Sequence, residues 1–319
     1  MRAVTYHEYG GPDRLSLVDL SVPEPKRAEV RVKVLACGIN LSDWENLTGS
    51  PLYARLGGLF RPGRPVLGSD IVGEIIALGE GVTGWAVGDR VWAEVVMRGG
   101  GFAQECTLPA NRLARVPEDL DNVTAAALPQ PGSIALAGTK GVKAGQKVLI
   151  NGAGGASGPL AIQLAKAAGA HVTGVDHAGK AAFMRARGAD RVIDYRSTDF
   201  ADEDVHYDLI LDLVGTRPMR RIAPVLAPGG RYRLIGGTMR AMFSALFMGF
   251  ARGVMSGKKI GVGAAEGDPA TLDRIGALAM EGRLTPEIAG TLGLDGVPEA
   301  LAQVGAGAAA GKLVVLPNG

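Results

Sequence analysis

The sequence Lys147-Val-Leu-Ile-Asn-Gly-Ala-Gly-Gly-Ala-Ser-Gly158 is the most informative segment of this chain for its fold class. Its first residues form a short apolar run that predicts a buried strand. Glycines then recur at three-residue spacing, and Pro159 suits the first turn of a helix. Residues 160–168 have helix-forming composition, and residues 171–175 predict a second strand that ends at Asp176. Strand, glycine turn, helix, strand and acid therefore follow one another in order.

This order favours a site for a dinucleotide. A pyrophosphate needs backbone N–H donors at close range and the positive end of a helix dipole, and side chains would block that approach. An acid roughly twenty residues beyond the glycines can bind the ribose hydroxyls, and Asp176 has this position. Because the chain holds 48 glycines in 319 residues, the turn alone is weak evidence, and a purely structural turn is the alternative. The predicted phosphate-binding residues are Gly152, Gly154, Gly155, Ala156, Ser157 and Gly158.

The composition narrows the class of protein. A length of 319 residues favours two domains, and 47% apolar residues allow a substantial core. The net charge of +2 and the lack of a long basic run argue against a nucleic-acid partner. Two cysteines, Cys37 and Cys106, cannot form a disulfide framework, and the N-terminus shows no apolar signal region. We therefore expect a cytoplasmic protein.

Residues 241–255 are the most membrane-like segment. They are interrupted by glycines and an arginine, and they are shorter than the roughly twenty residues that a span requires. We expect an amphipathic helix that covers a pocket or a subunit contact, without stable membrane insertion. A peripheral membrane role remains an alternative for this segment.

The chain changes character twice. Up to about residue 122, short strands alternate with glycine turns, which predicts a barrel-like domain. Residues 123–263 alternate strands with helices, as expected for a doubly wound parallel sheet. Residues 264–319 carry two modest helices and one apolar strand, too little for a separate domain. We therefore predict an α/β protein in which residues 264–319 complete the domain formed by residues 1–122.

Several motifs resemble the medium-chain dehydrogenase/reductase superfamily. These motifs are Gly88-Asp-Arg-Val91, Gly101-Phe-Ala-Gln104, the glycine turn and Gly188-Ala-Asp-Arg-Val-Ile-Asp-Tyr195. Gly38-Ile-Asn-Leu-Ser-Asp-Trp44 is similar to the segment beside the nicotinamide in the zinc-free quinone oxidoreductase (zeta-crystallin-like) branch. The resemblance implies a GroES-like β-barrel domain, a Rossmann domain that binds a dinucleotide, and a homodimer.

The resemblance also implies a site without metal. The zinc enzymes of this superfamily carry cysteine where this chain has Asn40 and histidine where it has Ser69. Catalytic zinc takes three protein ligands, and the region of the structural zinc lobe, residues 98–106, has one cysteine. A site without a Lewis acid favours hydride addition to a conjugated acceptor over reduction of an isolated ketone. The enolate or phenolate that forms from a conjugated acceptor has a delocalised negative charge, whereas the alkoxide from a ketone does not.

Three residues are candidates for catalysis. Asn40 would hydrogen-bond the nicotinamide ribose or the substrate carbonyl, with a turn residue as the alternative. Asp43 is equally well explained as a helix cap. Much of the branch has tyrosine in the place of Glu45, so Tyr53 is a possible substitute donor or a packing residue.

The cofactor choice is divided. Asp176 repels a 2′-phosphate and favours NAD, whereas Lys180 and Tyr195 match the branch's contacts to the 2′-phosphate of NADP. The resemblance therefore slightly favours NADP(H) over NAD(H). Two later strand ends resemble the family's further cofactor contacts, which implies roles for Val214, Gly215, Ile235, Gly236 and Gly237.

These inferences predict an NAD(P)H-dependent, metal-independent oxidoreductase that transfers hydride to a quinone or an α,β-unsaturated carbonyl. Two alternatives remain open. One is a metal-free alcohol or aldehyde dehydrogenase, and the other is a nucleotide-binding protein with a structural or regulatory role and little turnover. For the predicted reductase and for the dehydrogenase alternative, the partner is a small-molecule substrate.

Overall fold

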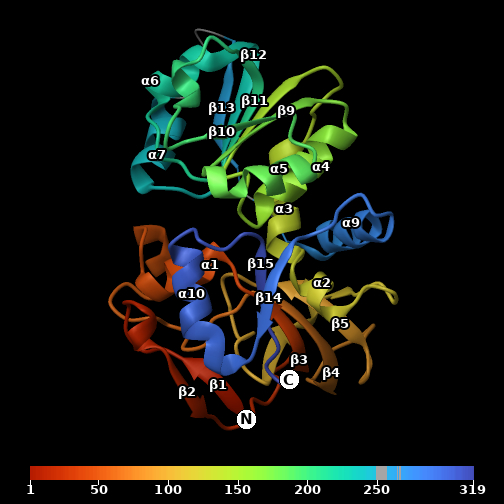
Figure 1. The fold of residues 1–319 in the computed structure, drawn as a ribbon. Helices are drawn as coiled ribbons and strands as arrows, with labels where there is room; N and C mark the ends of the chain where they lie inside the picture. The colour runs from red at the N-terminus through yellow and green to blue at the C-terminus, as the bar shows by residue number, and fades with distance from the viewer. Residues whose placement is uncertain (249–256, 264, 266) are drawn as a thin grey trace. The chain divides into compact units, whose positions relative to one another are not determined.

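The computed structural model describes residues 1–248, 257–263, 265 and 267–319. The chain forms two compact units (Figure 1). Unit 1 comprises Met1–Ser133 and Glu266–Gly319, and unit 2 comprises Ile134–Ala265. The first division falls inside helix α3 (Pro129–Thr139), further along the chain than the predicted boundary after Asn122.

Unit 1 is built on a seven-stranded sheet. Its order is β14-β15-β3-β4-β5-β7, with β6 paired to β3, and β1 and β2 form a separate antiparallel pair. The strands are β1 (Arg2–Thr5), β2 (Ser16–Asp19), β3 (Glu29–Gly38), β4 (Asp70–Leu78), β5 (Arg90–Glu94), β6 (Glu105–Pro109), β7 (Ala114–Arg115), β14 (Ile288–Leu292) and β15 (Lys312–Val315). Alternate residues of β3, including Val30, Val32 and Val34, are buried in the core.

The second segment of unit 1 shares this core with the first. Leu313 and Val315 of β15 belong to the same buried cluster as Val32 and Ile71, and β15 pairs with β3. Helix α10 (Val297–Gly305) packs against α1 (Leu41–Thr48). A Cβ on Gly305 would lie 2.3 Å from the Trp44 ring, so glycine is required for this close approach. The remaining helices of unit 1 are α2 (Asn122–Ala126) and α9 (Pro269–Met280).

Unit 2 is the predicted doubly wound parallel sheet. Its order is β10-β9-β8-β11-β12-β13, and every neighbouring pair is parallel. Figure 1 shows α4 and α5 beside one face of the sheet and α6 and α7 beside the other. The elements are β8 (Lys147–Asn151), α4 (Ser157–Ala167), β9 (His171–Asp176), α5 (Ala181–Ala186), β10 (Arg191–Asp194), β11 (Tyr207–Asp212), α6 (Met219–Ile222), β12 (Leu226–Leu234), α7 (Met239–Phe243) and β13 (Lys259–Val262).

Two predicted helices differ from the structure. The sequence also predicts a helix over residues 218–226, but α6 ends at Ile222, because Pro224 lacks the N–H that would continue it, and β12 begins at Leu226. The helix expected over residues 241–255 begins earlier, at Met239, where the Thr238 side chain accepts the Ala241 N–H, and it becomes a π-helical turn, η7 (Ser244–Met248). Residues 249–255 of that prediction lie outside the described residues. In the part of the chain that is described, no helix is long and apolar enough to cross a bilayer.

Candidate active site

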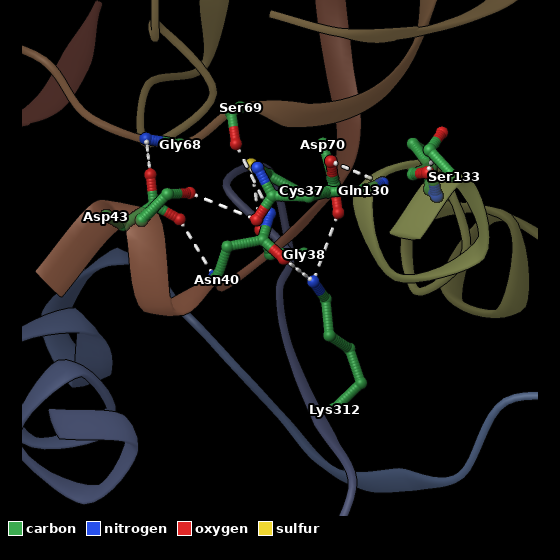
Figure 2. Close-up of polar contacts among 12 residues, drawn as sticks. Cys37, Gly38, Asn40, Asp43, Gly68, Ser69, Asp70, Gln130, Ser133 and Lys312 are labelled. Atoms are coloured by element: carbon green, nitrogen blue, oxygen red, sulfur yellow. Dashed lines mark hydrogen bonds and ion pairs between the residues drawn. The ribbon is translucent and has the colours of Figure 1, made fainter. Parts of the chain in front are cut away.

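A buried cluster of polar side chains lies where β3, β4 and β15 of unit 1 meet (Figure 2). The Lys312 ammonium donates to Oδ1 of Asn40 and, at 3.0 Å, to Oδ2 of Asp70. The Asn40 amide Nδ2 donates to Ser69 Oγ at 3.2 Å, and the Gln130 backbone N–H donates to Asp70 Oδ1 at 3.1 Å. We call these five residues the Lys312 cluster.

The strand register brings the cluster together. Gly38, the last residue of β3, pairs with Asp70 on β4 and with Val314 on β15. A Cβ on Gly38 would lie 2.2 Å from the Ala126 carbonyl oxygen and 2.6 Å from Cε of Lys312. Glycine is therefore required at this position to leave room for the Lys312 side chain.

The ion pair in the cluster is closed to solvent. The side chains of Lys312 and Asp70 are 2% and 0% exposed. A buried charge without a partner is strongly destabilising, so each member requires the other. Burial raises the pKa of Asp70, and the Lys312 ammonium opposes that rise. Glu94, which pairs with Asp70 across the β4–β5 ladder, is a second carboxyl whose pKa burial raises, and its proximity increases the dependence of Asp70 on Lys312.

Asp43 lies beside the cluster in the first turn of α1. Its Oδ2 accepts the Asn40 N–H at 2.8 Å, and its Oδ1 accepts the Gly68 N–H at 3.0 Å. Burial raises the pKa of Asp43 to about 7, although the two backbone N–H donors lower it. Because both carboxylate oxygens bond to the backbone, Asp43 fixes the segment that leads to Ser69 against the start of α1. Its catalytic role stays a prediction.

Tyr53 bonds to a different partner. Its hydroxyl donates to Glu45 Oε1 at 2.8 Å, and burial raises the pKa of Glu45. Among the described residues no hydrogen bond joins Tyr53 to Asn40. Tyr53 and Asp43 line one small cavity of about 60 Å³ together with Tyr6 and Tyr9. Such a cavity holds water but is too small for a quinone ring. The structure thus gives Tyr53 a hydrogen-bond partner of its own, and its catalytic role stays a prediction.

The glycine turn of unit 2 joins β8 to α4. The N–H groups of Gly152 and Ala153 donate to the Val175 carbonyl at 2.9 and 3.1 Å, which fixes the turn against β9. Gly152 has φ of +88°, a conformation that favours glycine. In the part of the chain that the structure describes, no side chain caps the first turn of α4, which begins at Ser157 after Ala156. Its N–H groups are therefore available for an anion.

The other glycines of the turn serve different purposes. A Cβ on Gly158 would lie 2.5 Å from the Ala153 backbone, and one on Gly154 would lie 2.5 Å from Cδ of Lys180. These two positions are required by packing. A Cβ on Gly155 would meet only the Gly152 carbonyl oxygen, at 3.5 Å. The space beside Gly155 is therefore not filled by packing of the chain, which fits a position where a ligand approaches the backbone closely.

The end of β9 carries the residues that would distinguish NAD from NADP. Asp176 Oδ2 accepts the Gly154 N–H at 2.9 Å, and its Oδ1 accepts the His177 N–H at 2.8 Å. Nζ of Lys180 lies 3.9 Å from Asp176 Oδ1, and Lys180 is only 4% exposed. Tyr195 is exposed on the neighbouring strand end. The Asp176 side chain is 12% exposed, so Asp176 and Lys180 form an ion pair with little exposure to solvent.

Asp212, the last residue of β11, bonds to the segments that hold the predicted cofactor residues after β11 and β12. Its Oδ1 accepts N–H groups from Asn151 Nδ2, Val214 and Gly215 at 2.8, 3.0 and 2.9 Å, and its Oδ2 accepts the Tyr232 hydroxyl at 2.8 Å. The carbonyl of Gly215 accepts the Thr238 hydroxyl at 3.2 Å. That bond joins the turn after β11 to the segment after β12, which contains Ile235, Gly236 and Gly237. Of the five predicted cofactor residues after β11 and β12, Val214, Gly215 and Ile235 donate their backbone N–H groups to Asp212. Gly236 and Gly237 have positive φ, a conformation that favours glycine.

The sequence analysis does not identify Lys312 as a site residue, although the structure places it at the centre of the cluster. A signal was present, because this lysine opens a strand whose next four residues, Leu313-Val-Val-Leu316, are apolar. A lysine in a buried strand requires a buried acid. The sequence does not say which acid, since Asp70 lies far away along the chain.

Comparisons with known proteins agree with this architecture. Residues 26–118 match the family "Alcohol dehydrogenase GroES-like domain", and residues 187–315 match "Zinc-binding dehydrogenase". Human quinone oxidoreductase is 32% identical over 74% of this chain and 73% of its own length. The 2-methylene-furan-3-one reductase of Solanum lycopersicum is 27% identical over 99% of this chain and 79% of its own. The structure of the quinone oxidoreductase from Coxiella burnetii has a TM-score of 0.89 at 28% identity and covers 99% of both chains.

Fold and site together define an oxidoreductase of the medium-chain dehydrogenase/reductase superfamily, with a GroES-like unit and a Rossmann unit. Within that superfamily the chain belongs to the zinc-free quinone oxidoreductase branch. Membership implies a nicotinamide cofactor. Among the described residues no group of three His, Cys, Asp or Glu side chains is arranged to hold a metal ion.

Proposed function

We propose that this protein reduces a quinone or an α,β-unsaturated carbonyl at the expense of a reduced nicotinamide dinucleotide. The Lys312 cluster is the observation that carries the proposal. It places a fixed ammonium and the donors of Asn40 and Ser69 in a region of low dielectric, where they can stabilise negative charge that develops on an acceptor oxygen. The human and Coxiella relatives are named for quinones and the tomato relative for an enone.

Asn40 has the central role in this proposal. Its amide is oriented by two bonds, since Oδ1 accepts from Lys312 and Nδ2 donates to Ser69. An amide nitrogen carries two hydrogens, and the second is the donor that we assign to the acceptor oxygen. The contact of Oδ1 with a cation polarises the amide and strengthens that donor.

The residues of unit 2 fit the cofactor. The uncapped start of α4 and the open position at Gly155 suit a pyrophosphate, and we assign the ribose hydroxyls to Asp176. A bound nicotinamide dinucleotide would supply the hydride. We propose NADH as the better-bound form, in contrast to the slight preference for NADP(H) suggested by the sequence. The reason is that Lys180 is paired with Asp176, and the carboxylate would repel a 2′-phosphate.

Two further proposals concern the setting of the enzyme. We expect a homodimer that pairs through β13, one of the two edge strands of the unit 2 sheet, and light scattering would test the oligomeric state. We also expect a cytoplasmic location, where Cys37 and Cys106, both buried and not joined to each other, stay reduced.

The activity is tested by following the oxidation of NADH and NADPH with three acceptors: a para-quinone, an α,β-unsaturated ketone and a saturated aldehyde. We expect turnover with the first two. Asn40→Ala should lower kcat by about a hundredfold, whereas cofactor affinity, read from nicotinamide fluorescence, should change little. Leu41→Ala, at an exposed neighbour, is the matched control.

Other outcomes identify the alternatives. Turnover confined to the aldehyde would indicate an alcohol dehydrogenase. Cofactor binding without oxidation by any acceptor would indicate a structural or regulatory protein. Unchanged kcat in Asn40→Ala would remove the assigned role of the amide.

A further inference from the structure

Residues 52–64, between α1 and β4, present large apolar side chains to solvent. Leu52, Leu56, Leu59 and Phe60 are 67%, 78%, 61% and 87% exposed. Single exposed leucines are common on protein surfaces, but four large apolar side chains within nine residues form a patch that requires an explanation. We call residues 52–64 the apolar loop.

The apolar loop is also positively charged. Residues 46–69 contain three arginines and no acidic residue. Arg55 is engaged locally, because its Nε donates to the Gly49 carbonyl at 2.9 Å and its guanidinium lies 4.6 Å from the centre of the Tyr9 ring. Arg61 and Arg64 are exposed and have no ion pair within the described residues. Two uncompensated cations therefore border the apolar side chains.

The backbone holds the apolar loop in shape. The Tyr9 hydroxyl donates to the Gly58 carbonyl, and the Gly58 N–H donates to the Arg55 carbonyl at 2.9 Å. A Cβ on Gly58 would lie 2.0 Å from the Arg61 carbonyl oxygen, so the loop turns back tightly on itself. The apolar side chains are thus displayed by a preorganised turn, which lowers the entropic cost of binding a partner.

We propose that the apolar loop is a peripheral docking surface for an anionic phospholipid membrane. The leucines and Phe60 would enter the boundary between head groups and acyl chains, and Arg61 and Arg64 would contact lipid phosphates. Peripheral proteins bind membranes by this combination of buried apolar area and attraction to anionic lipid. The proposal goes beyond the reductase activity and depends on no step of it.

Charge complementarity selects the membrane over a second copy of the chain. In a two-fold contact the same patch of both copies meets, so two patches whose only charges are positive would be brought together. Juxtaposed like charges in an interface are unfavourable. An anionic surface instead neutralises them, and its acyl region accepts apolar side chains without requiring a specific shape.

Binding is tested with the full chain and vesicles made of phosphatidylcholine alone or mixed with phosphatidylglycerol. We expect flotation with the anionic vesicles only, and we expect it to weaken as salt increases. Leu56→Ser/Phe60→Ser should lower the partition coefficient by about tenfold or more. Arg61→Gln/Arg64→Gln should lower it by roughly twenty-fivefold, at about fivefold for each arginine.

The controls use exposed residues of unit 1 that lie outside the apolar loop. Val87→Ser removes a side chain that is 63% exposed, and Arg27→Gln removes an exposed arginine. Neither should change the partition coefficient. Phe60→Trp gives a direct signal, because indole emission should shift to shorter wavelength with anionic vesicles and be quenched by brominated lipid.

Three results would overturn the proposal. The first is no binding of the wild-type chain to anionic vesicles at low salt. The second is binding that the loop variants do not weaken. The third is a loss of dimer in the Leu56→Ser/Phe60→Ser variant without any vesicle binding by the wild type, which would make the apolar loop a contact between copies.

Discussion

Lys312 and Asp70 are 242 positions apart in the chain, yet Nζ and Oδ2 lie 3.0 Å apart where solvent is excluded. Asp70 is the first residue of β4 and Lys312 the first of β15. Because Lys312 also bonds to Asn40, the pair ties the start of α1 to two strands. The order of the candidate site therefore depends on one buried charge pair.

Breaking this pair should destabilise unit 1. We expect Lys312→Met to lower the free energy of unfolding by about 3–5 kcal/mol, because Asp70 is left buried without a cation. The chain has three tryptophans, Trp44, Trp85 and Trp92, and all belong to unit 1. Urea denaturation followed by tryptophan fluorescence thus reports on this unit.

The double variant Lys312→Met/Asp70→Asn is the control for that measurement. It removes both charges while keeping an oxygen for the Gln130 N–H, so much of the lost stability should return. A double variant no more stable than Lys312→Met would show that volume or shape, and not the charge pair, determines stability here.

Asp43 should make the stability of unit 1 depend on pH. Its pKa is raised to about 7 in the folded chain, whereas an unfolded aspartate titrates near pH 4. The folded state then binds more protons across this interval, so its stability falls as pH rises from about 4 to about 7. Relative to Asp43→Asn, the wild type should lose at most about 1.4 kcal/mol per pH unit in this window.

Urea midpoints of both chains at several pH values provide the measurement. The difference between them isolates Asp43 from Asp70 and Glu94, whose pKa values burial also raises. A constant difference across the window would mean that Asp43 titrates at its ordinary pKa, with the backbone donors from Asn40 and Gly68 outweighing burial.

Gly155 and Gly158 should respond differently to substitution. Gly155→Val adds a side chain that meets nothing closer than 3.5 Å at its Cβ, so folding should be unaffected while cofactor affinity falls by at least about tenfold. Gly158→Val places atoms against the Ala153 backbone and should destabilise unit 2 by about 1–3 kcal/mol. Amide hydrogen exchange in β8 and α4, with a binding titration, separates the two effects. Unchanged cofactor affinity in Gly155→Val would show that this turn does not bind the cofactor.

Asp176→Ser should shift cofactor preference. Removing the carboxylate ends its repulsion of a 2′-phosphate and releases Lys180, so the affinity ratio of NADPH to NADH should rise by roughly tenfold or more. Asp176→Asn is the matched control for the structure of the turn. It also removes the negative charge, but it keeps a side-chain oxygen that can accept the Gly154 N–H. Equal losses for both cofactors would limit Asp176 to holding the turn.

Elements with a strong local pattern could be predicted from the sequence. Strands β8 and β9 and helix α4 of unit 2 occur where the apolar runs and the helix-forming composition around the glycine turn place them. The short strands β1, β7 and β14 were not predicted, because few residues carry their signal and Gly290 interrupts β14. Tertiary pairing, not local preference, forms such strands.

The candidate site shows the same limit. Asn40 could be identified from the motif around it. Lys312 could not, because its role follows from the pairing of Gly38 with both Asp70 and Val314. Tyr53 was recognised as a potential donor, whereas its bond to Glu45 depends on how the segment after α1 folds. Residue type is local information, but the partner of a residue depends on the whole fold.

The split construction of unit 1 has a consequence for biosynthesis. Unit 2 is continuous in sequence, so it can fold as it leaves the ribosome, while residues 1–133 wait for a strand that is translated much later. Until β15 arrives, the β3 edge near Gly38 is unpaired, and Asp70 has no cation beside it. We therefore expect the nascent chain to expose this short strand edge until residues 312–315 are translated, and a chaperone that covers strand edges would protect it during that time.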